Sequence, residues 1–524
     1  MGARKPAPSA LYIYVETFRC VSHESPALSL AHAPSFAESR RMKPRLLIHG
    51  QRVETAATLT VRNPWTGAEL AHVPLGDAAT IDAAIASSAA AFPEVRRIAP
   101  HRRSDLLTAI AHGIALRKAD FANTIVAEAG KPITLAEAEV NRAVMTFTAA
   151  AEEARKQHGE VLDMDAFATG DGHLGIVRRF PIGIIAGITP FNFPLNLAAH
   201  KIAPAIASGN CIIVKPAPKC PLTMLLLADI LVEAGVPAGQ VNIITCANEH
   251  VHRLITDERI AMVSFTGSPA IGWQLKAAAG KKKVCLELGG NAAVILHADA
   301  DLDAAIPAIA AGSFAYAGQT CISVQRILIH DTLYAAFREK FTAYVAEKII
   351  LGDPSDPRTV VGPMITTEAA DLTRQRIARA VASGATRIGT DGTGPMLPPN
   401  ILENADDETS DCEFFAPVVT LHPYREFDDA LALVNASPFG LQCGIYTRDL
   451  QLALRAHERL EVGAVLINQT PTFRVENMPY GGVKDSGFGR EGIRYAMEEM
   501  TEPRALIIRL SASPVGYGAI ANSR

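Results

Sequence analysis

The run Gly183-Ile184-Ile185-Ala186-Gly187-Ile188 has no charged side chain and the length of one buried strand. Similar short apolar runs follow at 211–214, 241–244 and 262–265, and helix-like stretches such as 222–233 separate them. Short apolar strands that alternate with helices indicate a parallel sheet covered on both faces. We therefore expect an α/β fold with a doubly wound sheet, which binds ligands at the carboxyl ends of its strands.

A second α/β region begins near Asn291. Its apolar runs lie at 293–296 and 327–329, and helix-like stretches separate or follow them. The sequence therefore predicts two doubly wound parallel-sheet lobes that face each other. Segments 161–181 and 500–512 fit neither lobe, and the second contains an apolar strand that would invite aggregation if unpaired. We expect these segments to form a small β element that joins subunits into a homodimer or homotetramer.

Composition excludes several classes of function. The 524 residues are 48% hydrophobic and 20% charged with a net charge of −4, which gives no electrostatic case for nucleic acid or an anionic membrane. The uncharged run from Phe180 to Ala199 is long enough to span a bilayer, but Pro181, Pro190 and Pro194 interrupt it. We expect a strand, a loop and a helix start there, and no membrane partner.

The cysteines indicate a cytoplasmic protein without a metal site. The chain has eight cysteines, scattered, with no CxxC pair and no nearby histidine partners. This pattern argues against zinc and against a disulfide framework, and fits a reducing cytosol. Residues 1–42 lack periodicity and carry acidic residues that weaken a transit-peptide interpretation, so we expect a disordered extension.

Three residues form a plausible set for covalent catalysis. Cys321 lies in Gly-Gln-Thr-Cys-Ile-Ser, Glu287 in Leu-Glu-Leu-Gly-Gly-Asn and Asn192 in Pro-Phe-Asn-Phe-Pro. A thiolate attacks carbonyl carbon, and a nearby carboxylate can serve as its base. The alkoxide that forms needs donors, which the Asn192 amide and the Cys321 backbone N–H can supply. Taken one at a time, Cys321 could be an ordinary buried cysteine, Glu287 a charge at a strand end and Asn192 a turn residue. The combination of the three favours catalysis.

The cofactor signal is weaker. The stretch 265–272, Phe-Thr-Gly-Ser-Pro-Ala-Ile-Gly, follows an apolar run and opens a helix, whose N-terminus could face a diphosphate. It lacks GxGxxG, so a simple strand-to-helix turn is an equal alternative. Lys215 would lie at the carboxyl edge of the sheet, near an adenosine ribose. Glu413 could hold the other ribose, or could be an ordinary surface charge.

With these pieces in order, the sequence from about 43 to 511 resembles the aldehyde dehydrogenase superfamily. The motifs that carry the resemblance are PFNFP (190–194), KPA (215–217), FTGSPAIG (265–272), LELGGN (286–291), GQTCIS (318–323), EFFAPV (413–418) and MPYGGVKDSGFGREG (478–492). The C-terminal half is similar to the group containing lactaldehyde, semialdehyde and phosphonoacetaldehyde dehydrogenases. The phosphonoacetaldehyde enzymes carry a His after the oxyanion Asn and an Arg before the Cys. This chain has Phe193 and Thr320 at those positions, and this difference argues against phosphonoacetaldehyde as the substrate.

The resemblance implies a reaction and a domain plan. Cys321 would attack the aldehyde, hydride would pass to a nicotinamide, and Glu287 would activate water to hydrolyse the thioester. The nucleotide-binding lobe would comprise 43–160 and 182–288, the catalytic lobe 289–478, and the oligomerisation strands 161–181 and 500–512. The positions expected to bind NAD or NADP are Ile188, Thr189, Pro190, Phe191, Lys215, Pro218, Lys219, Phe265, Gly267, Ser268, Ile271, Gly289, Glu413 and Phe415.

One departure bears on the cofactor. Three residues after the motif Lys, many NAD-preferring members carry a Glu that repels a 2′-phosphate, whereas this chain has Pro218 followed by Lys219. NADP is therefore admissible.

Two arginines suggest the substrate. Arg474 precedes MPYGG and Arg142 lies on a predicted helix, in regions that line the substrate funnel in the family. A guanidinium fork suits a carboxylate, phosphonate or sulfonate, so we expect a small or anionic aldehyde such as a semialdehyde. The alternative is that both arginines bridge elements through salt bridges.

Two other classes of function are open. A thiol hydrolase of Glu/Cys type would need no nucleotide, and FTGSPAIG, KPA and EFFAPV would then have no purpose. A structural protein would have no chemical reason to keep Cys321, Glu287 and Asn192 together.

Overall fold

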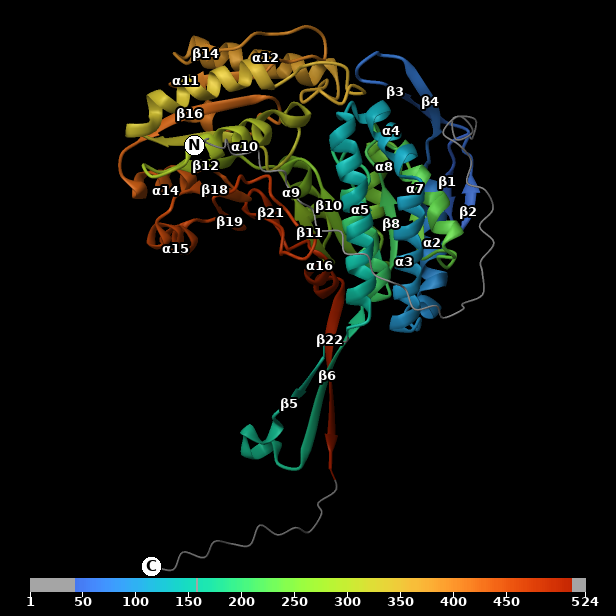
Figure 1. Cartoon of the computed structure of the whole chain (residues 1–524). Helices are drawn as coiled ribbons and strands as arrows, with labels where there is room; N and C mark the ends of the chain where they lie inside the picture. Colours follow the sequence, from blue (N-terminus) through green and yellow to red (C-terminus); the bar gives the residue numbers. More distant parts are fainter. Residues whose placement is uncertain (1–42, 157–158, 511–524) are drawn as a thin grey trace, which may run out of the picture. The chain divides into compact units, whose positions relative to one another are not determined.

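A computed structural model describes residues 43–156 and 159–510. It contains two large sheets flanked by helices and a third, small sheet (Figure 1). The expected α/β fold with two parallel-sheet lobes is confirmed. The expectation for residues 1–42 lies outside the described residues. No helix in the described ranges is long and apolar enough to cross a membrane.

The first large sheet has a parallel centre and antiparallel edges. Its strands, in spatial order, are β2 (Gln51–Val53), β1 (Leu46–Ile48), β9 (Val241–Ile243), β8 (Cys211–Lys215), β7 (Ile184–Ile188), β10 (Ile260–Thr266), β11 (Lys283–Glu287) and β21 (Gly487–Phe488). The helices of this half are α2 (Ala78–Val95), α3 (Pro100–Leu116), α4 (Lys118–Ala129), α5 (Ile133–Ala154), α6 (Asn196–Ser208), α7 (Leu222–Glu233), α8 (Asn248–Thr256), α9 (Pro269–Ala278) and α16 (Ile493–Glu499).

Both faces of this sheet are buried, which explains its uninterrupted apolar strands. Ile185 of β7 packs into one hydrophobic cluster with α3, α5, α6 and α7, whereas Ile184 and Ala186 pack into another with α2 and α8. Successive side chains of a strand point to opposite faces, so a sheet covered on both sides needs apolar residues at every position.

The second large sheet is parallel except for one edge strand. Its order is β14 (Thr386–Ile388), β15 (Asn400–Glu403), β16 (Val418–Tyr424), β13 (Val324–His330), β12 (Ala292–Leu296), β18 (Gln442–Tyr446) and β19 (Ala464–Ile467). Its helices are α10 (Leu302–Phe314), α11 (Asp331–Lys348), α12 (Thr367–Ala382), α13 (Asp407–Asp411), α14 (Phe427–Ala436) and α15 (Leu450–Arg459).

The third sheet joins the two segments that fitted neither lobe. β22 (Thr501–Arg509) pairs antiparallel with β6 (His173–Pro181) over its whole length, and β6 pairs with β5 (Glu160–Leu162). Leu506, Ile507 and Ile508 of β22 are 55%, 46% and 40% exposed. Two short two-stranded sheets complete the chain: β3 (Thr58–Arg62) with β4 (Glu69–Pro74), and β17 (Phe439–Gly440) with β20 (Val483–Lys484).

Candidate active site

Cys321 lies in the tight bend between α10 and β13. The short helix η3 (Ala315–Gly318) precedes it, and Tyr316, Ala317 and Gly318 all have positive φ, of 54°, 53° and 65°. Two non-glycine residues in this region are costly and mark a functional constraint more often than an accident. A Cβ on Gly318 would lie 2.3 Å from the carbonyl oxygen of Ala416, so the bend is packed against the chain before β16.

Asn192 contacts the same bend. It lies in the loop between β7 and α6, and its amide nitrogen donates to the carbonyl oxygen of Gln319, at 2.9 Å. Asn192 is far from Cys321 in sequence, but the residue that it contacts, Gln319, lies two positions before the thiol.

A buried ion pair fixes the loop that carries Asn192. Oε1 of Glu139 accepts the backbone N–H groups of Leu195 and Asn196, at 2.9 and 3.1 Å, and so caps the start of α6. Its other carboxylate oxygen accepts from the Lys131 ammonium. The Lys131 nitrogen also lies 3.5 Å from the centroid of the Phe193 ring, so one buried charge contacts both sides of the loop.

Glu287 is the last residue of β11, and its carboxyl group is buried without a partner. Neither of its oxygens has a hydrogen bond within the part of the chain that the structure describes. A Cβ on Gly481 would lie 2.8 Å from its Oε1, which explains the glycine after Tyr480. Burial, and next the charge of Glu491, raise the pKa of Glu287 well above its usual value. A carboxyl group with a raised pKa is suited to general acid–base work near neutral pH.

Cys321 is half-buried. Burial of the thiol raises the pKa of Cys321 above its ordinary value, and a hydrogen bond with the Tyr480 hydroxyl, at 3.1 Å, opposes that rise. The other six cysteines in the described ranges are also unpaired. Tyr480 belongs to the MPYGG motif, but no local pattern singled it out as a contact of Cys321.

The two predicted arginines lie in a cluster of buried charges. Arg142 Nε donates to Glu476 at 2.8 Å, and Arg474 Nη2 donates to Glu491 at 3.3 Å. Lys201 pairs with Glu491 at 3.0 Å as well. Both arginines therefore form the salt bridges that sequence reasoning had offered as the alternative.

This cluster still has unused donors. Nη2 of Arg142 and Nε of Arg474 are buried without a hydrogen-bond partner among the described residues. Burial opposes ionisation of Glu476, but its contacts with His200 and Arg142 lower its pKa to about 2. Burial likewise opposes ionisation of Glu491, yet the charges of Lys201 and Arg474 lower its pKa to about 2. The two ionised carboxylates thus pair with Arg142, Arg474 and Lys201, and Glu287 is a further carboxyl group beside Arg474 and Lys201.

The predicted cofactor residues gather at the carboxyl edge of the first sheet. They are Ile188, Thr189, Pro190 and Phe191 after or at the end of β7, Lys215, Pro218 and Lys219 at or after the end of β8, Phe265, Gly267, Ser268 and Ile271 around the β10–α9 turn, and Gly289 after β11. Open α/β sheets bind nucleotides at this edge.

Orphaned polar groups at that edge fit a bound nucleotide. The hydroxyls of Thr189 and Thr266 are buried without a hydrogen-bond partner in the described chain. Burial lowers the pKa of Lys215, whose ammonium has no carboxylate within ion-pair distance among the same residues. Ser268 is the N-cap of α9 and Pro269 is its first residue, so free backbone N–H groups begin there. A phosphate and ribose hydroxyls would satisfy these groups.

Glu413 and Phe415 approach from the chain before β16. Oε1 of Glu413 accepts the backbone N–H of Gly290 at 2.9 Å, and burial raises the pKa of Glu413 to about 7. A Cβ on Gly289 would lie 2.1 Å from the other oxygen of Glu413. Phe415 has φ of 50° and packs edge-on against Phe191, with ring centroids 6.0 Å apart. These two residues therefore contact the chain at the carboxyl edge of the first sheet, and their role in binding cofactor stays a prediction.

Sequence reasoning missed the residues that hold this site together. These are Lys131, Glu139, His200, Lys201, Glu476, Tyr480 and Glu491. Tyr480 and Glu491 lie inside the quoted MPYGGVKDSGFGREG motif, which is the one signal that could have found them.

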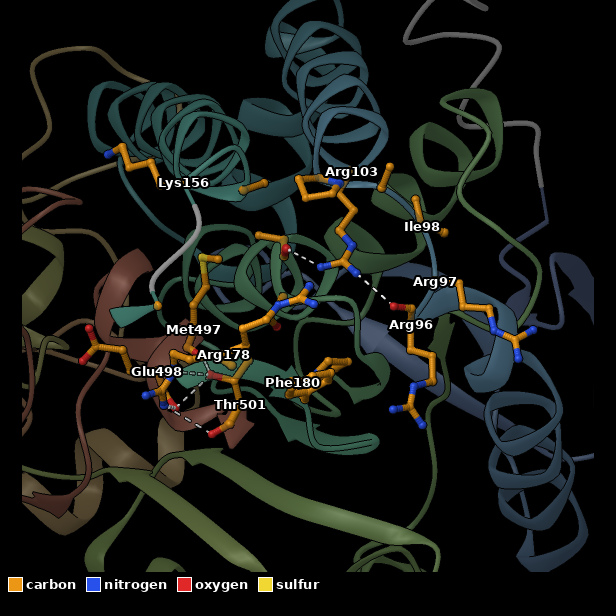
Figure 2. A pocket seen from close by; sticks show the side chains of 18 residues that line it. Arg96, Arg97, Ile98, Arg103, Lys156, Arg178, Phe180, Met497, Glu498 and Thr501 are labelled. Atoms are coloured by element: carbon orange, nitrogen blue, oxygen red, sulfur yellow. Dashed lines mark hydrogen bonds between the residues drawn. The ribbon is translucent and has the colours of Figure 1, made fainter. Parts of the chain in front are cut away.

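A separate basic cavity of about 290 Å³ lies at the base of β6 and β22 (Figure 2). Arg103 there donates to the carbonyl oxygens of Arg96 and Ala207, and Arg179 donates to the carbonyl oxygen of Glu498. None of the predicted site residues lines it, and these arginines are already engaged in holding helix ends.

Comparisons with known proteins agree with this arrangement. Residues 52–506 match the family described as "Aldehyde dehydrogenase family". The 3-sulfolactaldehyde dehydrogenase of Priestia megaterium is 38% identical over 469 residues, which are 89% of this chain and 98% of that protein.

Two solved structures share the fold. Aldehyde dehydrogenase 21 from Physcomitrella patens, in complex with the reaction product succinate, has a TM-score of 0.88 and 39% identity over 90% of this chain and 99% of its own. Glyceraldehyde-3-phosphate dehydrogenase from Methanocaldococcus jannaschii, complexed with NADP, has a TM-score of 0.83 and 38% identity over 86% of this chain and 99% of its own.

Proposed function

Because the chain belongs to the aldehyde dehydrogenase family, we propose that it oxidises a small anionic aldehyde to the carboxylic acid, with NAD or NADP as oxidant. The observation that carries the anionic part is the unpartnered guanidinium nitrogen on each of Arg142 and Arg474. The hydrolase and structural alternatives have no support from the family to which the chain belongs.

The reaction divides among three residues. The Cys321 sulfur attacks the aldehyde carbon, and the Asn192 amide with the Cys321 backbone N–H stabilises the alkoxide that forms. NAD or NADP, held at the carboxyl edge of the first sheet, would supply the hydride acceptor that oxidation of the thiohemiacetal on Cys321 to a thioester requires. Glu287 removes a proton from water, the water oxygen adds to the thioester carbon, and the Cys321 sulfur leaves as a thiolate with the electron pair of the C–S bond. The unpartnered carboxyl of Glu287 supports this role, because nothing in the described chain competes for its oxygens.

The anion of the substrate is assigned to the two guanidinium groups. Arg142 is one quarter exposed, whereas Arg474 is almost fully buried, so Arg142 is the outer contact. The named relatives support this class of substrate, because sulfolactaldehyde carries a sulfonate, succinate a second carboxylate and glyceraldehyde 3-phosphate a phosphate. An anion that displaces neither glutamate would accept hydrogen bonds from the unpartnered nitrogens of Arg142 and Arg474.

NADP is the nucleotide that the β8 edge favours. Lys219 is exposed beside Pro218, and no acidic residue stands at that position to repel a 2′-phosphate. The orphaned Thr189 and Thr266 hydroxyls and Lys215 support binding of either nucleotide.

The domain plan and the assembly belong to the same proposal. Residues 43–160 and 182–288 bind the nucleotide, 289–478 carry the thiol, and β5, β6 and β22 join subunits into a homodimer or homotetramer. The row of exposed apolar residues on β22 supports that role, since an isolated protein rarely leaves such a strand uncovered. Unpaired cysteines support a reducing compartment such as the cytoplasm.

The test compares a charged with a neutral aldehyde of equal length, succinic semialdehyde and butanal, with NADP and NAD. Wild-type protein should reduce nucleotide, and Cys321→Ala should abolish turnover while nucleotide binding remains. Arg142→Gln should raise KM for succinic semialdehyde at least about 10-fold, which is the loss expected for one charge-assisted hydrogen bond, and leave KM for butanal within about twofold. Arg155→Gln, the same change at the far end of α5, is the matched control. Equal effects on both aldehydes would refute the anion assignment, and full activity of Cys321→Ala would refute the mechanism.

A further inference from the structure

The hydroxyl of Tyr480 lies 3.1 Å from the Cys321 sulfur, and it has no second hydrogen-bond partner among the described residues. The side chain is buried, with 3% of the residue exposed. A buried phenol normally has a partner for its hydroxyl, and here that partner is the nucleophile itself.

The protein holds this ring rigidly. The backbone of Tyr480 exchanges two hydrogen bonds with Glu491, at 3.0 and 2.7 Å. The guanidinium carbon of Arg474 lies 3.7 Å from the centre of the ring, and the same arginine is bound to Glu491. A cation over the face of a phenol draws electron density from the ring and makes the O–H a stronger donor.

The direction of the hydrogen bond depends on the state of the sulfur. When Cys321 is a thiol, either atom can donate. When it is a thiolate it has no proton, so only Tyr480 can donate. Burial, and next the charge on Cys321, raise the pKa of Tyr480 well above its ordinary value, so the phenol keeps its proton throughout the working range of pH.

We propose that Tyr480 is a positioning residue that holds the Cys321 sulfur in place and donates a hydrogen bond to its thiolate, with Arg474 strengthening the donor. The inference rests on the proposed function in one respect, namely that Cys321 is the nucleophile. When the sulfur ionises, its proton passes to Glu287 and Tyr480 keeps its own. Once the sulfur has bonded to the aldehyde carbon it no longer carries a charge, so the contact stabilises the reactive thiolate more than the later thioester.

The same contact links substrate recognition to the nucleophile. Arg474 is both the inner guanidinium of the anion site and the cation beneath the Tyr480 ring. Arg474, which would bind the anionic group of the substrate, therefore contacts the same tyrosine that is hydrogen-bonded to the attacking sulfur.

The experiment measures the pH dependence of Cys321 alkylation in the full-length enzyme without substrate. Iodoacetamide inactivation rates are followed from pH 6 to 10.5 for wild type, Tyr480→Phe and the control Tyr334→Phe, which removes a hydroxyl bonded to the distant Glu403. Mass spectrometry confirms that Cys321 is the labelled residue. Binding of NADP and the thermal midpoint check that Tyr480→Phe, which loses one oxygen and keeps its ring, is folded.

Tyr480→Phe should move the midpoint of the alkylation profile up by about one pH unit, the lower end of what a hydrogen bond to a charged group contributes. Alkylation at pH 7 should then be about 10-fold slower, while the rate well above both midpoints is equal or higher, because a more basic thiolate is a better nucleophile. Tyr334→Phe should follow the wild-type profile. Incorporation of 3-fluorotyrosine, a stronger donor, should move the wild-type midpoint down and leave that of Tyr480→Phe unchanged.

The outcomes separate the inference from the function on which it rests. An unchanged midpoint in Tyr480→Phe with Cys321 still labelled overturns the role of Tyr480 and leaves the proposed reaction intact. A lower limiting rate at high pH with an unchanged midpoint also overturns it, because a merely structural residue would act in that way. Labelling that abolishes activity at a cysteine other than Cys321 overturns the proposed reaction instead. Should Tyr480→Phe prove unfolded, the 3-fluorotyrosine shift alone decides, and its absence refutes the proposal.

Discussion

Replacing Glu139 with Gln should destabilise the protein in a way that depends on pH. The substitution keeps the shape of the side chain, and its Oε1 can still accept the N–H groups of Leu195 and Asn196. The second oxygen becomes an amide NH₂ that faces the Lys131 ammonium, so two donors meet. Lys131 then carries a buried charge with only the rings of Phe193 and Tyr316 beside it.

The size of the loss has two bounds. Breaking a buried ion pair by removing one partner typically costs about 3–5 kcal/mol. Lys131 can avoid part of that cost by losing its proton. Deprotonation costs about 1.36 kcal/mol for each pH unit below the unfolded pKa of about 10.4, which is about 4.6 kcal/mol at pH 7. At pH 9 the same deprotonation costs only about 1.9 kcal/mol.

Proton linkage gives the direction in which the stability of Glu139→Gln changes with pH. Burial already lowers the pKa of Lys131, and Glu139 is the group that opposes this most, so the variant has a folded pKa lower still. The unfolded chain then binds more protons than the folded one, and stability rises with pH. The loss in Glu139→Gln should therefore be about 3–4 kcal/mol at pH 7 and no more than about 2 kcal/mol at pH 9.

Thermal unfolding of both proteins at pH 7 and pH 9, with wild type as the reference at each pH, measures this difference. Glu137→Gln, an exposed position on the same helix, is the matched control. Lys131→Met combined with Glu139→Gln should recover most of the stability, because no uncompensated charge remains. A loss of equal size at the two pH values would refute the reasoning, since it would trace to packing and not to the ammonium.

Two further predictions concern the site directly. Glu287→Gln should leave a burst of reduced nucleotide and lower the steady-state rate about 10²–10⁴-fold, which is the usual contribution of a general base. Stopped-flow absorbance at 340 nm measures both phases, and an unchanged steady-state rate would remove Glu287 from the deacylation step. Gly289→Ala should raise the Kd for NADP about 10-fold, because the added Cβ would lie 2.1 Å from the Glu413 carboxylate. Fluorescence titration measures this Kd, and an affinity equal to that of wild type would show that Glu413 does not contact the nucleotide.

Local patterns in the sequence predicted the architecture well. The apolar runs at 183–188 and 211–214 became β7 and β8, and the helix-like stretch at 222–233 became α7, because buried strands and helices have sequence patterns that can be read without tertiary information. The segments that fitted neither lobe do form a sheet of their own, with Thr501 opposite Pro181 and Arg509 opposite His173. Their role in assembly stays a prediction.

The partners of the catalytic residues could not be predicted in the same way. Tyr480 and Cys321 are 159 residues apart, and Arg142 and Glu476 are 334 residues apart. Contacts of this kind depend on how two lobes close on one another, which no local pattern encodes. The sequence therefore indicated the groups that we propose to react, and the structure was needed to find the groups that contact them.

The pairing of Arg142 and Arg474, which we propose bind the substrate anion, with Glu476 and Glu491 constrains how substrate preference can change. Loss of Arg142 alone would leave Glu476 ionised in a desolvated place, and loss of Arg474 would do the same to Glu491. A lineage or a directed-evolution library that moves toward uncharged aldehydes should accordingly show strong epistasis, with both members of a pair replaced together and single replacements rarely recovered.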